Sequence, residues 1–291
     1  MCCTLRPADL SKTILYSGEA LNECSLVHVL GYQNRARNRA VGPNAMILPF
    51  PAATKMSRLN CLESKGLRWL MKSLADPIEL PNLMRSRGFS KSALTLGSRS
   101  IEVFDSGEYT VVLAQDARDV PTALDKVPEA KRPPLNEEIF DAYAKWYPNW
   151  PIAVCCFETR HKEMEPDPLL WWFEPMDKKV LFAPALDAHN GSAPDLKSQV
   201  RVDHTVVFGS TRTPRGASVH FRGDVPSHVV PFIPGRVMGH EFRGSQQNGD
   251  FAIPLDRLTD VDEKATGSQV KVNRVLPPGA VRSGASTLEL S

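Results

Sequence analysis

Short apolar runs separated by polar turns extend along most of the chain, and this pattern predicts many β-strands. KTILYSGEA and CSLVHVLGYQ are two such runs separated by LNE, and they predict an antiparallel pair. AMILPFPAA predicts a third strand that ends at Pro49 and Pro51, because proline cannot donate to a strand ladder. These three consecutive strands predict an N-terminal meander.

The apolar period becomes helical over residues 57–76. Ser57 is a suitable N-cap, and Asp76 and Pro77 end the run. The apolar positions at helical spacing are Leu59, Leu62, Leu67, Leu70, Met71 and Leu74. Residues 77–99 show no sustained period and predict a long basic loop, which in a compact domain is more often functional or mobile than inert.

The middle of the chain combines strands with short helices. IEVFDSGEYTVVLAQD predicts a hairpin that turns at Ser106 and Gly107, and residues 117–127 and 136–147 predict two helices. Three further strands are predicted in PIAVCCFE, PLLWWFEP and KVLFAPAL.

Strands dominate again after Gly191, in QVRVDHTVVFGS, ASVHFRG, SHVVPFI, RVMGHEF and DFAIPL. Residues 260–291 are rich in Ser, Gly and charge and predict a mobile tail. The sequence therefore predicts a β-dominated α+β fold of antiparallel sheets, meander or sandwich-like, with a few helices. We expect one domain over residues 1–259, with a sub-boundary near residue 190.

Composition agrees with a folded, strand-rich chain. The 291 residues are 42% hydrophobic and 23% charged, as in ordinary globular proteins, and the 24 prolines fall between apolar runs. No apolar stretch approaches the roughly 20 residues of a membrane helix. The first residues also lack the basic and apolar regions of a signal peptide. We expect a cytoplasmic protein with no membrane partner.

Charge is segregated along the chain despite a net charge of +2. Basic residues outnumber acidic ones by 14 to 6 in residues 1–100, and acidic residues outnumber basic ones by 18 to 10 in residues 101–200. Two interpretations are open. The two portions pack against each other within one chain, which is the favoured interpretation, or the basic portion meets an anionic partner.

The cysteines and histidines do not predict a metal site or a cofactor. The six cysteines include two adjacent pairs, Cys2 with Cys3 and Cys155 with Cys156, but no CxxC spacing. Adjacent residues of a strand point to opposite faces, so buried reduced thiols are the expected state. The C-terminal strands contain no His-x-His pair among their polar candidates His204, His220, His228, His240, Asp203 and Glu241.

Cys2 carries the catalytic alternative. Removal of Met1 would leave an amine and a thiol on one residue, as an N-terminal-nucleophile amidohydrolase requires. Arg6, Asp9 and Asn44 are the candidates beside the thiol or in the oxyanion hole. Pro7 interrupts the long first strand that such an enzyme uses, so we expect this activity less than binding.

Basic residues carry the binding alternative. RARNR and RSRGFSK could hold phosphates, and the candidate residues are Arg35, Arg37, Arg39, Arg85, Arg87 and Lys91. No nucleic-acid recognition motif frames them, and the pI of 8.2 is below the strongly basic range of a dedicated nucleic-acid binder. Solvated loops are therefore the favoured interpretation, with nucleic acid as the weaker one.

The order of several segments resembles an uncharacterised bacterial domain family. These segments are MCC, a strand pair, NAMILPFPA, a linking helix, FDSGEYTVVLAQDARDVPTALDKV, WPIAVCCFE and EPDPLLWWFE. The likeness spans residues 1–210 and is best carried by ILPFPA at 47–52 and SGEYTVVLAQD at 106–116. The chain lacks the family's secretion signal and its Cys-Gly-Gly-Phe-Phe-Cys opening. The resemblance implies architecture and no catalytic residue.

The sequence thus predicts a non-catalytic binding or self-assembly protein whose partner is another protein or a second copy of the chain. The alternative is the amidohydrolase that uses Cys2. If the basic portion met the acidic portion of a neighbour, the apparent size in light scattering would fall as salt rises, because exposed charge pairs are screened over about 10 Å at 0.1 M.

Overall fold

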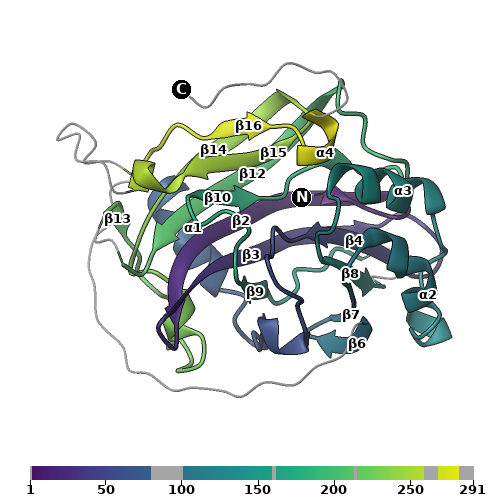
Figure 1. Ribbon diagram of the computed structural model, residues 1–291, viewed down its shortest axis with the longest axis horizontal. Helices are drawn as coiled ribbons and strands as arrows, with labels where there is room; N and C mark the ends of the chain where they lie inside the picture. Colours follow the sequence, from purple (N-terminus) through teal and green to yellow (C-terminus); the bar gives the residue numbers. More distant parts are fainter. Residues whose placement is uncertain (1, 80–100, 159–161, 213–214, 259–267, 282–291) are drawn as a thin grey trace.

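The computed structural model confirms a strand-rich fold with several antiparallel sheets and few helices (Figure 1). It describes residues 2–79, 101–158, 162–212, 215–258 and 268–281. The strands are β1 (Cys2–Cys3), β2 (Ala8–Asn22), β3 (Ser25–Asn38), β4 (Asn44–Pro49), β5 (Cys61–Leu62), β6 (Ile101–Ser106), β7 (Tyr109–Ala114), β8 (Ile152–Phe157), β9 (Leu169–Phe173), β10 (Val180–Ala183), β11 (Asp187–Ala188), β12 (Gln199–Ser210), β13 (Ala217–Ser218), β14 (Arg236–Gln247), β15 (Asp250–Pro254) and β16 (Asn273–Val275). The α-helices are α1 (Leu70–Glu79), α2 (Val120–Leu124), α3 (Glu137–Trp146) and α4 (Pro278–Val281), and short 3-10 helices are η1 (Arg58–Asn60), η2 (Ala117–Asp119), η3 (Glu129–Lys131), η4 (Val230–Phe232) and η5 (Leu255–Leu258).

Two large sheets form the body of the protein. A seven-stranded sheet has the order β13-β14-β12-β2-β3-β9-β5, and a four-stranded sheet has the order β4-β8-β7-β6. In Figure 1 the long strands β2 and β3 run side by side through the middle of the fold. Most pairs are antiparallel, but β2 pairs with β12 in parallel. A three-stranded sheet, β10-β15-β16, and the parallel pair β1-β11 complete the strands.

Alternation of side chains along the strands builds successive apolar layers. In β8, Ala153, Cys155 and Phe157 join the core between the two large sheets, where Trp171 and Phe50 also pack. Residues at the other positions of β8 face a second core that α2 and α3 cover. Cys155 and Cys156 therefore point to opposite faces, as predicted from their adjacency.

Helix α1 covers the outer face of the seven-stranded sheet. It contacts five strands that are neighbours in that sheet, β13, β14, β12, β2 and β3. Leu70, Met71, Leu74 and Ile78 recur at helical spacing and are all buried in a third core. Burial of this apolar stripe fixes the helix across the strands and leaves its other face for polar groups.

Several predicted elements are confirmed. The hairpin at residues 101–114 is β6 and β7, which pair from Ile101 with Ala114 to Ser106 with Tyr109. Helix α3 begins after Asn136, whose side-chain oxygen accepts a hydrogen bond from the amide of Ile139 at 3.3 Å.

The predicted meander is wrong in its third strand. β2 and β3 pair as expected, but β4 lies in the four-stranded sheet and pairs with β8. The alternation of apolar residues identifies a strand without identifying its partner, because both large sheets bury apolar faces.

The predicted helix over residues 57–76 begins too early and ends too soon. Ser57 caps η1 in a capping box with Asn60, and α1 starts only at Leu70. Pro77 lies inside the helix, which continues to Glu79 while Ile78 is buried against the sheet. The free energy gained by burying Ile78 offsets the loss of the backbone hydrogen bond that Pro77 cannot donate. Residues 80–99 of the predicted basic loop lie outside the described residues.

The C-terminal part also differs from the predicted pattern. SHVVPFI, predicted as a strand, contains η4 instead, because Pro231 fits the start of a helical turn. Within the predicted tail, Asn273–Val275 form β16 against β15 and Pro278–Val281 form α4. Within the part of the chain that the structure describes, no helix has the length and apolarity to cross a bilayer.

Candidate binding site

A β-bulge interrupts the pairing of β2 and β3. Ser11 pairs with Arg35 and Ile14 pairs with Gln33, so Lys12 and Thr13 together stand opposite Asn34. Lys12 has a φ of +50°, a left-handed conformation that costs free energy for a residue with a side chain. Bulges of this kind redirect side chains and are over-represented beside functional sites.

Helix α1 turns its polar face toward this bulge. Lys72, Ala75, Asp76 and Glu79 lie at positions i, i+3, i+4 and i+7, so they share one face of the helix. All four line a cleft of about 300 Å³ that lies between α1 and the strands. The other lining residues are Lys12, Ile14, Gln33, Asn34, Arg35, Glu165, Asp203, Thr205, Arg222 and Arg243.

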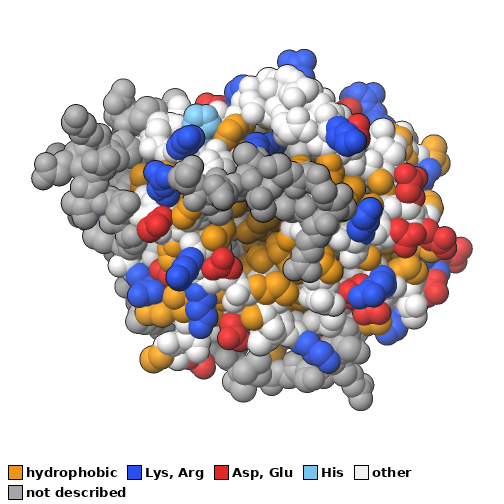
Figure 2. Space-filling model, turned by 45° about the horizontal axis from the view of Figure 1, so that its top comes forward, with side chains coloured by type: hydrophobic (Ala, Val, Ile, Leu, Met, Phe, Trp, Pro, Cys, Tyr) orange, Lys and Arg blue, Asp and Glu red, His pale blue; other side chains and the backbone are white. Residues whose placement is uncertain are grey.

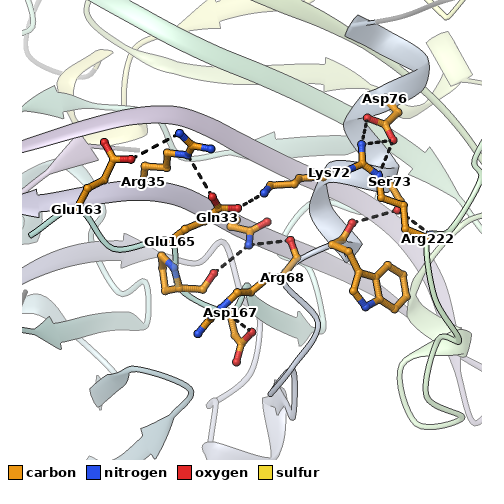
Figure 3. Close-up of polar contacts among 12 residues, drawn as sticks. Gln33, Arg35, Arg68, Lys72, Ser73, Asp76, Glu163, Glu165, Asp167 and Arg222 are labelled. Carbon is orange, nitrogen blue, oxygen red and sulfur yellow. Dashed lines mark hydrogen bonds and ion pairs between the residues drawn. The ribbon is translucent and has the colours of Figure 1, made fainter.

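Glu165 holds two of the cations of this cleft, hereafter the bulge cleft. Its Oε2 lies 3.1 Å from Arg35 Nε, and its Oε1 pairs with Lys72 Nζ (Figure 3). Arg35 also reaches Glu163, with 3.5 Å between Nη1 and Oε1. Burial raises the pKa of the Glu165 carboxyl, but Lys72 and Arg35 outweigh this effect and the pKa is lowered. Glu165 therefore stays ionised and ties β3 to α1.

Two further ion pairs lie at the sides of the bulge cleft. Arg222 Nη2 donates to both carboxylate oxygens of Asp76, at 2.7 and 2.8 Å. Arg243 pairs with Asp203, whose Oδ2 also accepts a hydrogen bond from the Lys12 amide at 3.1 Å. The carboxylate of Asp203 thus fixes the bulged backbone from the neighbouring strand β12.

Asn34 lies buried beneath the cleft. The residue is 1% exposed, and among the described residues neither its amide nitrogen nor its oxygen has a hydrogen-bond partner. Because side chains alternate along β3, that of Asn34 shares a face with Tyr32 and Ala36, which pack in the core between the two large sheets. Gln33 points to the opposite face, where its amide nitrogen donates to two backbone carbonyl oxygens (Figure 3).

The basic residues predicted from the sequence do not form one site. Arg35 lies in the bulge cleft. Arg39 pairs instead with Asp9, at 2.5 Å between Nε and Oδ2, and Arg37 is exposed on β3. The remaining candidates, Arg85, Arg87 and Lys91, lie outside the described residues.

The residues predicted around Cys2 hold the backbone of the first strands. The backbone of Cys2 pairs with Asp187 in the parallel pair β1-β11. Arg6 donates a side-chain hydrogen bond to the carbonyl of Val41. Asn44 is fully buried and binds both backbone groups of Arg6, each at 3.0 Å. The carboxamide of Asn44 is thus occupied by structural hydrogen bonds.

Cysteine thiols inside the fold are protonated. Burial raises the pKa of Cys61 and of Cys156 to about 12. Cys155 is fully buried, and its pKa is also raised by burial. Among the described residues, no group of three or more His, Cys, Asp and Glu side chains is placed to hold a metal ion.

The segregated charges meet within one chain. Arg35 and Lys72, from the basic portion, pair with Glu165 of the acidic portion. Arg68 pairs with Glu108 and Asp167, again across the two portions. Figure 2 shows basic and acidic side chains interspersed over one face of the protein. These pairs agree with the favoured interpretation of the charge pattern, in which the basic and acidic portions pack against each other within one chain.

Sequence reasoning missed the residues that make the bulge cleft distinctive. Lys12 and Glu79 come from segments far apart in the sequence, and no motif links them. The available signal was weak: the period of residues 70–79, which separates an apolar from a polar face.

Comparisons with known proteins give no family. No protein-family model and no curated protein matches the chain. Among solved structures, that of baculovirus P35 is similar with a TM-score of 0.42 and 14% identity, over 86% of this chain and 90% of that one. A mutated baculovirus P35 after caspase cleavage gives a TM-score of 0.41 and 13% identity, over 84% and 91% of the two chains. These scores are too low to carry an inference about this chain.

Proposed function

We propose that this protein is a non-catalytic binding protein and that the bulge cleft is its ligand site. The observation that carries the proposal is the polar lining of the cleft, where Glu165, Asp76 and Asp203 hold cations at fixed positions around a volume of about 300 Å³. Ligand sites are typically concave and orient the ligand with a small number of placed polar groups.

The lining of the bulge cleft is fixed before a ligand arrives. Glu165 holds Arg35 and Lys72, while Asp203 holds both Arg243 and the backbone of Lys12. These contacts tie β2, β3, β12, β14 and α1 around one cavity. Preorganised groups lower the entropic cost of binding.

The lining supports binding better than catalysis. Among the described residues that line the bulge cleft there is no cysteine, histidine or serine. Its one hydroxyl, on Thr205, donates to Glu79 at 2.6 Å. The lining thus has no imidazole or thiolate, two of the groups that commonly act as base or nucleophile in covalent catalysis.

The in-chain ion pairs favour binding at the bulge cleft over self-assembly through segregated charge. A cation that is already paired with a carboxylate of its own chain gains little binding free energy from a carboxylate on a second copy of the chain. A protein partner remains compatible with the proposal if it inserts a short segment into the cleft.

A panel of small polar molecules, screened by thermal denaturation, tests the proposal. A compound that binds the bulge cleft should raise the melting temperature of the wild type, because binding to the folded state alone stabilises it. Lys72→Met removes a cation of the lining, one that Glu165 holds, and should reduce that rise.

Lys55→Met is the matched control, because Lys55 is exposed and outside the bulge cleft. It should keep the wild-type shifts in melting temperature. If no compound shifted the wild type, or if Lys72→Met kept the same shifts, the bulge cleft would not be a ligand site and the proposal would be wrong.

A further inference from the structure

The chain contains two Asn-Gly steps, Asn190-Gly191 and Asn248-Gly249. Asparagine followed by glycine is chemically labile, because glycine has no side chain to hinder attack of its own amide nitrogen on the asparagine Cγ. The structure places the two steps in opposite surroundings. Asn190 is exposed, whereas Asn248 is 1% exposed.

The side chain of Asn190 is folded back on its own turn. Its Oδ1 accepts hydrogen bonds from the Ser192 amide at 3.1 Å and from the Ser192 hydroxyl at 2.7 Å. A side-chain turn of this kind carries the asparagine Cγ over the peptide that follows it, here that of Gly191. Among the described residues, nothing binds the side-chain nitrogen of Asn190. The oxygen of the carboxamide is thus held by two donors, while its amino group is free to leave.

We propose that the turn of Asn190, Gly191 and Ser192 is a self-modification site that converts Asn190 to aspartate or isoaspartate, with water as the only co-reactant. The Gly191 nitrogen bonds to the Asn190 Cγ, the Cγ–Nδ2 bond breaks, and the amide proton leaves with Nδ2 as ammonia. Water then opens the resulting succinimide at either of its carbonyl carbons. None of these three residues lines the bulge cleft, so the inference is independent of the proposed ligand site.

Ser192 supplies the donors that the attack requires. Negative charge develops on the Asn190 Oδ1 as the nitrogen adds to Cγ, and hydrogen bonds to a charged oxygen are stronger than those to a neutral one. Donors that are already in place therefore stabilise the tetrahedral intermediate more than the starting amide. The two hydrogen bonds from Ser192 act as a small oxyanion hole.

The fold requires glycine at position 191. Gly191 has a φ of +82°, and a Cβ there would lie 2.9 Å from the Arg6 Cα and 3.0 Å from the Leu5 carbonyl oxygen. Both of these atoms belong to the backbone, which cannot move aside as the end of a flexible side chain would. The labile step is therefore built into the packing of this turn against the first strands.

Asn248 is protected by the hydrogen bonds of its carboxamide. Its Oδ1 accepts from the Asp187 amide at 2.9 Å, and its Nδ2 donates to the carbonyl oxygens of Asp187, at 2.9 Å, and Asp195, at 3.1 Å. The carbonyl and the leaving group are both held, so these bonds must break before Cγ can be attacked. The same dipeptide at 248–249 thus serves as an internal control.

Isoaspartate at position 190 should loosen the start of α3. The Gly191 carbonyl oxygen accepts a hydrogen bond at 2.7 Å from Asn136, the N-cap of that helix. Isoaspartate routes the main chain through its Cβ, which adds one backbone atom before Gly191 and displaces this carbonyl. The amide hydrogen of Ile139, which donates to Asn136, should then exchange faster in modified than in unmodified protein.

Incubation of the folded, full-length protein in mildly alkaline buffer tests the inference. Peptide mass spectrometry of timed samples should show conversion of Asn190 roughly tenfold faster than that of Asn248, or more, because the hydrogen bonds of Asn248 must open first. In protein unfolded with guanidinium chloride the two sites should convert at similar rates. An Asn190 that stayed unmodified in the folded protein, or equal rates at both sites there, would overturn the inference.

Ser192→Ala tests the role of the hydroxyl. Loss of one hydrogen bond to the developing oxyanion should slow conversion of Asn190 by roughly two- to tenfold. Ser245→Ala is the control, because Ser245 is exposed on β14 and its hydroxyl contacts Gln199, and this variant should keep the wild-type rate. A rate in Ser192→Ala equal to or above that of wild type would show that the hydroxyl restrains the side chain instead, contrary to the proposal.

Discussion

Replacement of Asn44 with leucine should lower the free energy of unfolding by about 3 to 4 kcal/mol, because each buried polar group left unpaired costs about 1 to 3 kcal/mol. The Asn44 oxygen accepts from the amides of Arg6, at 3.0 Å, and Ala45, at 2.8 Å. Its nitrogen donates to the Arg6 carbonyl and, at 3.2 Å, to the side-chain oxygen of Asn38. Leucine at position 44 would leave these partners without their bonds inside the protein.

Urea denaturation of wild type and Asn44→Leu measures this effect. Asn190→Leu is the control, because Asn190 is exposed and its side-chain oxygen serves only its own turn, accepting from Ser192. That control should change stability by less than about 1 kcal/mol. A similarly small effect of Asn44→Leu would show that Asn44 does not hold β4 to the first strands. Asn44 would then again be a candidate for the oxyanion hole beside Cys2.

Two buried titratable groups should give opposite pH dependences of stability. Burial lowers the pKa of His28 to about 4, against the opposing influence of Asp177 and the Lys178 backbone. His28 is therefore neutral in the folded protein while the unfolded chain binds a proton, so its contribution is present above pH 6.5 and is lost as pH falls toward 4. At about 1.4 kcal/mol for each pKa unit, acidification to pH 4.5 removes about 2 to 3 kcal/mol.

Asp250 has the opposite effect on the pH dependence of stability. Burial raises its carboxyl pKa to about 6, although Tyr147 and the Ala185 amide donate hydrogen bonds to it. The folded protein binds a proton at Asp250 before the unfolded chain does, so acidification from pH 6 to 4.5 adds about 2 kcal/mol to stability. In wild type the two contributions largely cancel over this interval.

Single variants separate the two contributions. His28→Phe should become more stable as pH falls from 7 to 4.5, and Asp250→Asn should become less stable over the same interval, each by about 2 to 3 kcal/mol. Denaturation midpoints at several pH values measure both slopes. His240→Gln, at an exposed position, should keep the wild-type profile. Parallel profiles for the two core variants would contradict the assigned roles.

Local patterns predicted the local elements of the fold. The hairpin of β6 and β7 and the helix predicted over residues 136–147 follow from turn chemistry and apolar period, which act between residues near in sequence. The partner of β4 could not be predicted in this way. Its pairing with β8 joins residues about 100 positions apart, and the apolar sequence of β4 suits either large sheet.

The candidate site was harder to predict than the fold. Arg35 was identified as a binding residue, but for an exposed basic patch, whereas the structure pairs it with Glu165 in the bulge cleft. The bulge became visible only in the register of β2 and β3, where Lys12 and Thr13 share the position opposite Asn34. A one-residue insertion in a strand leaves no signal in a single sequence, since its only mark is a change in pairing.

The side-chain Nε signal of Arg35 provides the most direct test of the bulge cleft. In protein labelled with ¹⁵N-arginine, the signal of Arg35 is identified by its loss in Arg35→Lys, and the small polar molecules of the panel are then titrated in. We predict that the Arg35 signal shifts as a compound binds, while that of Arg118, which pairs with Asp116 outside the cleft, stays in place. An Arg35 signal that stayed unchanged with every compound would contradict the account.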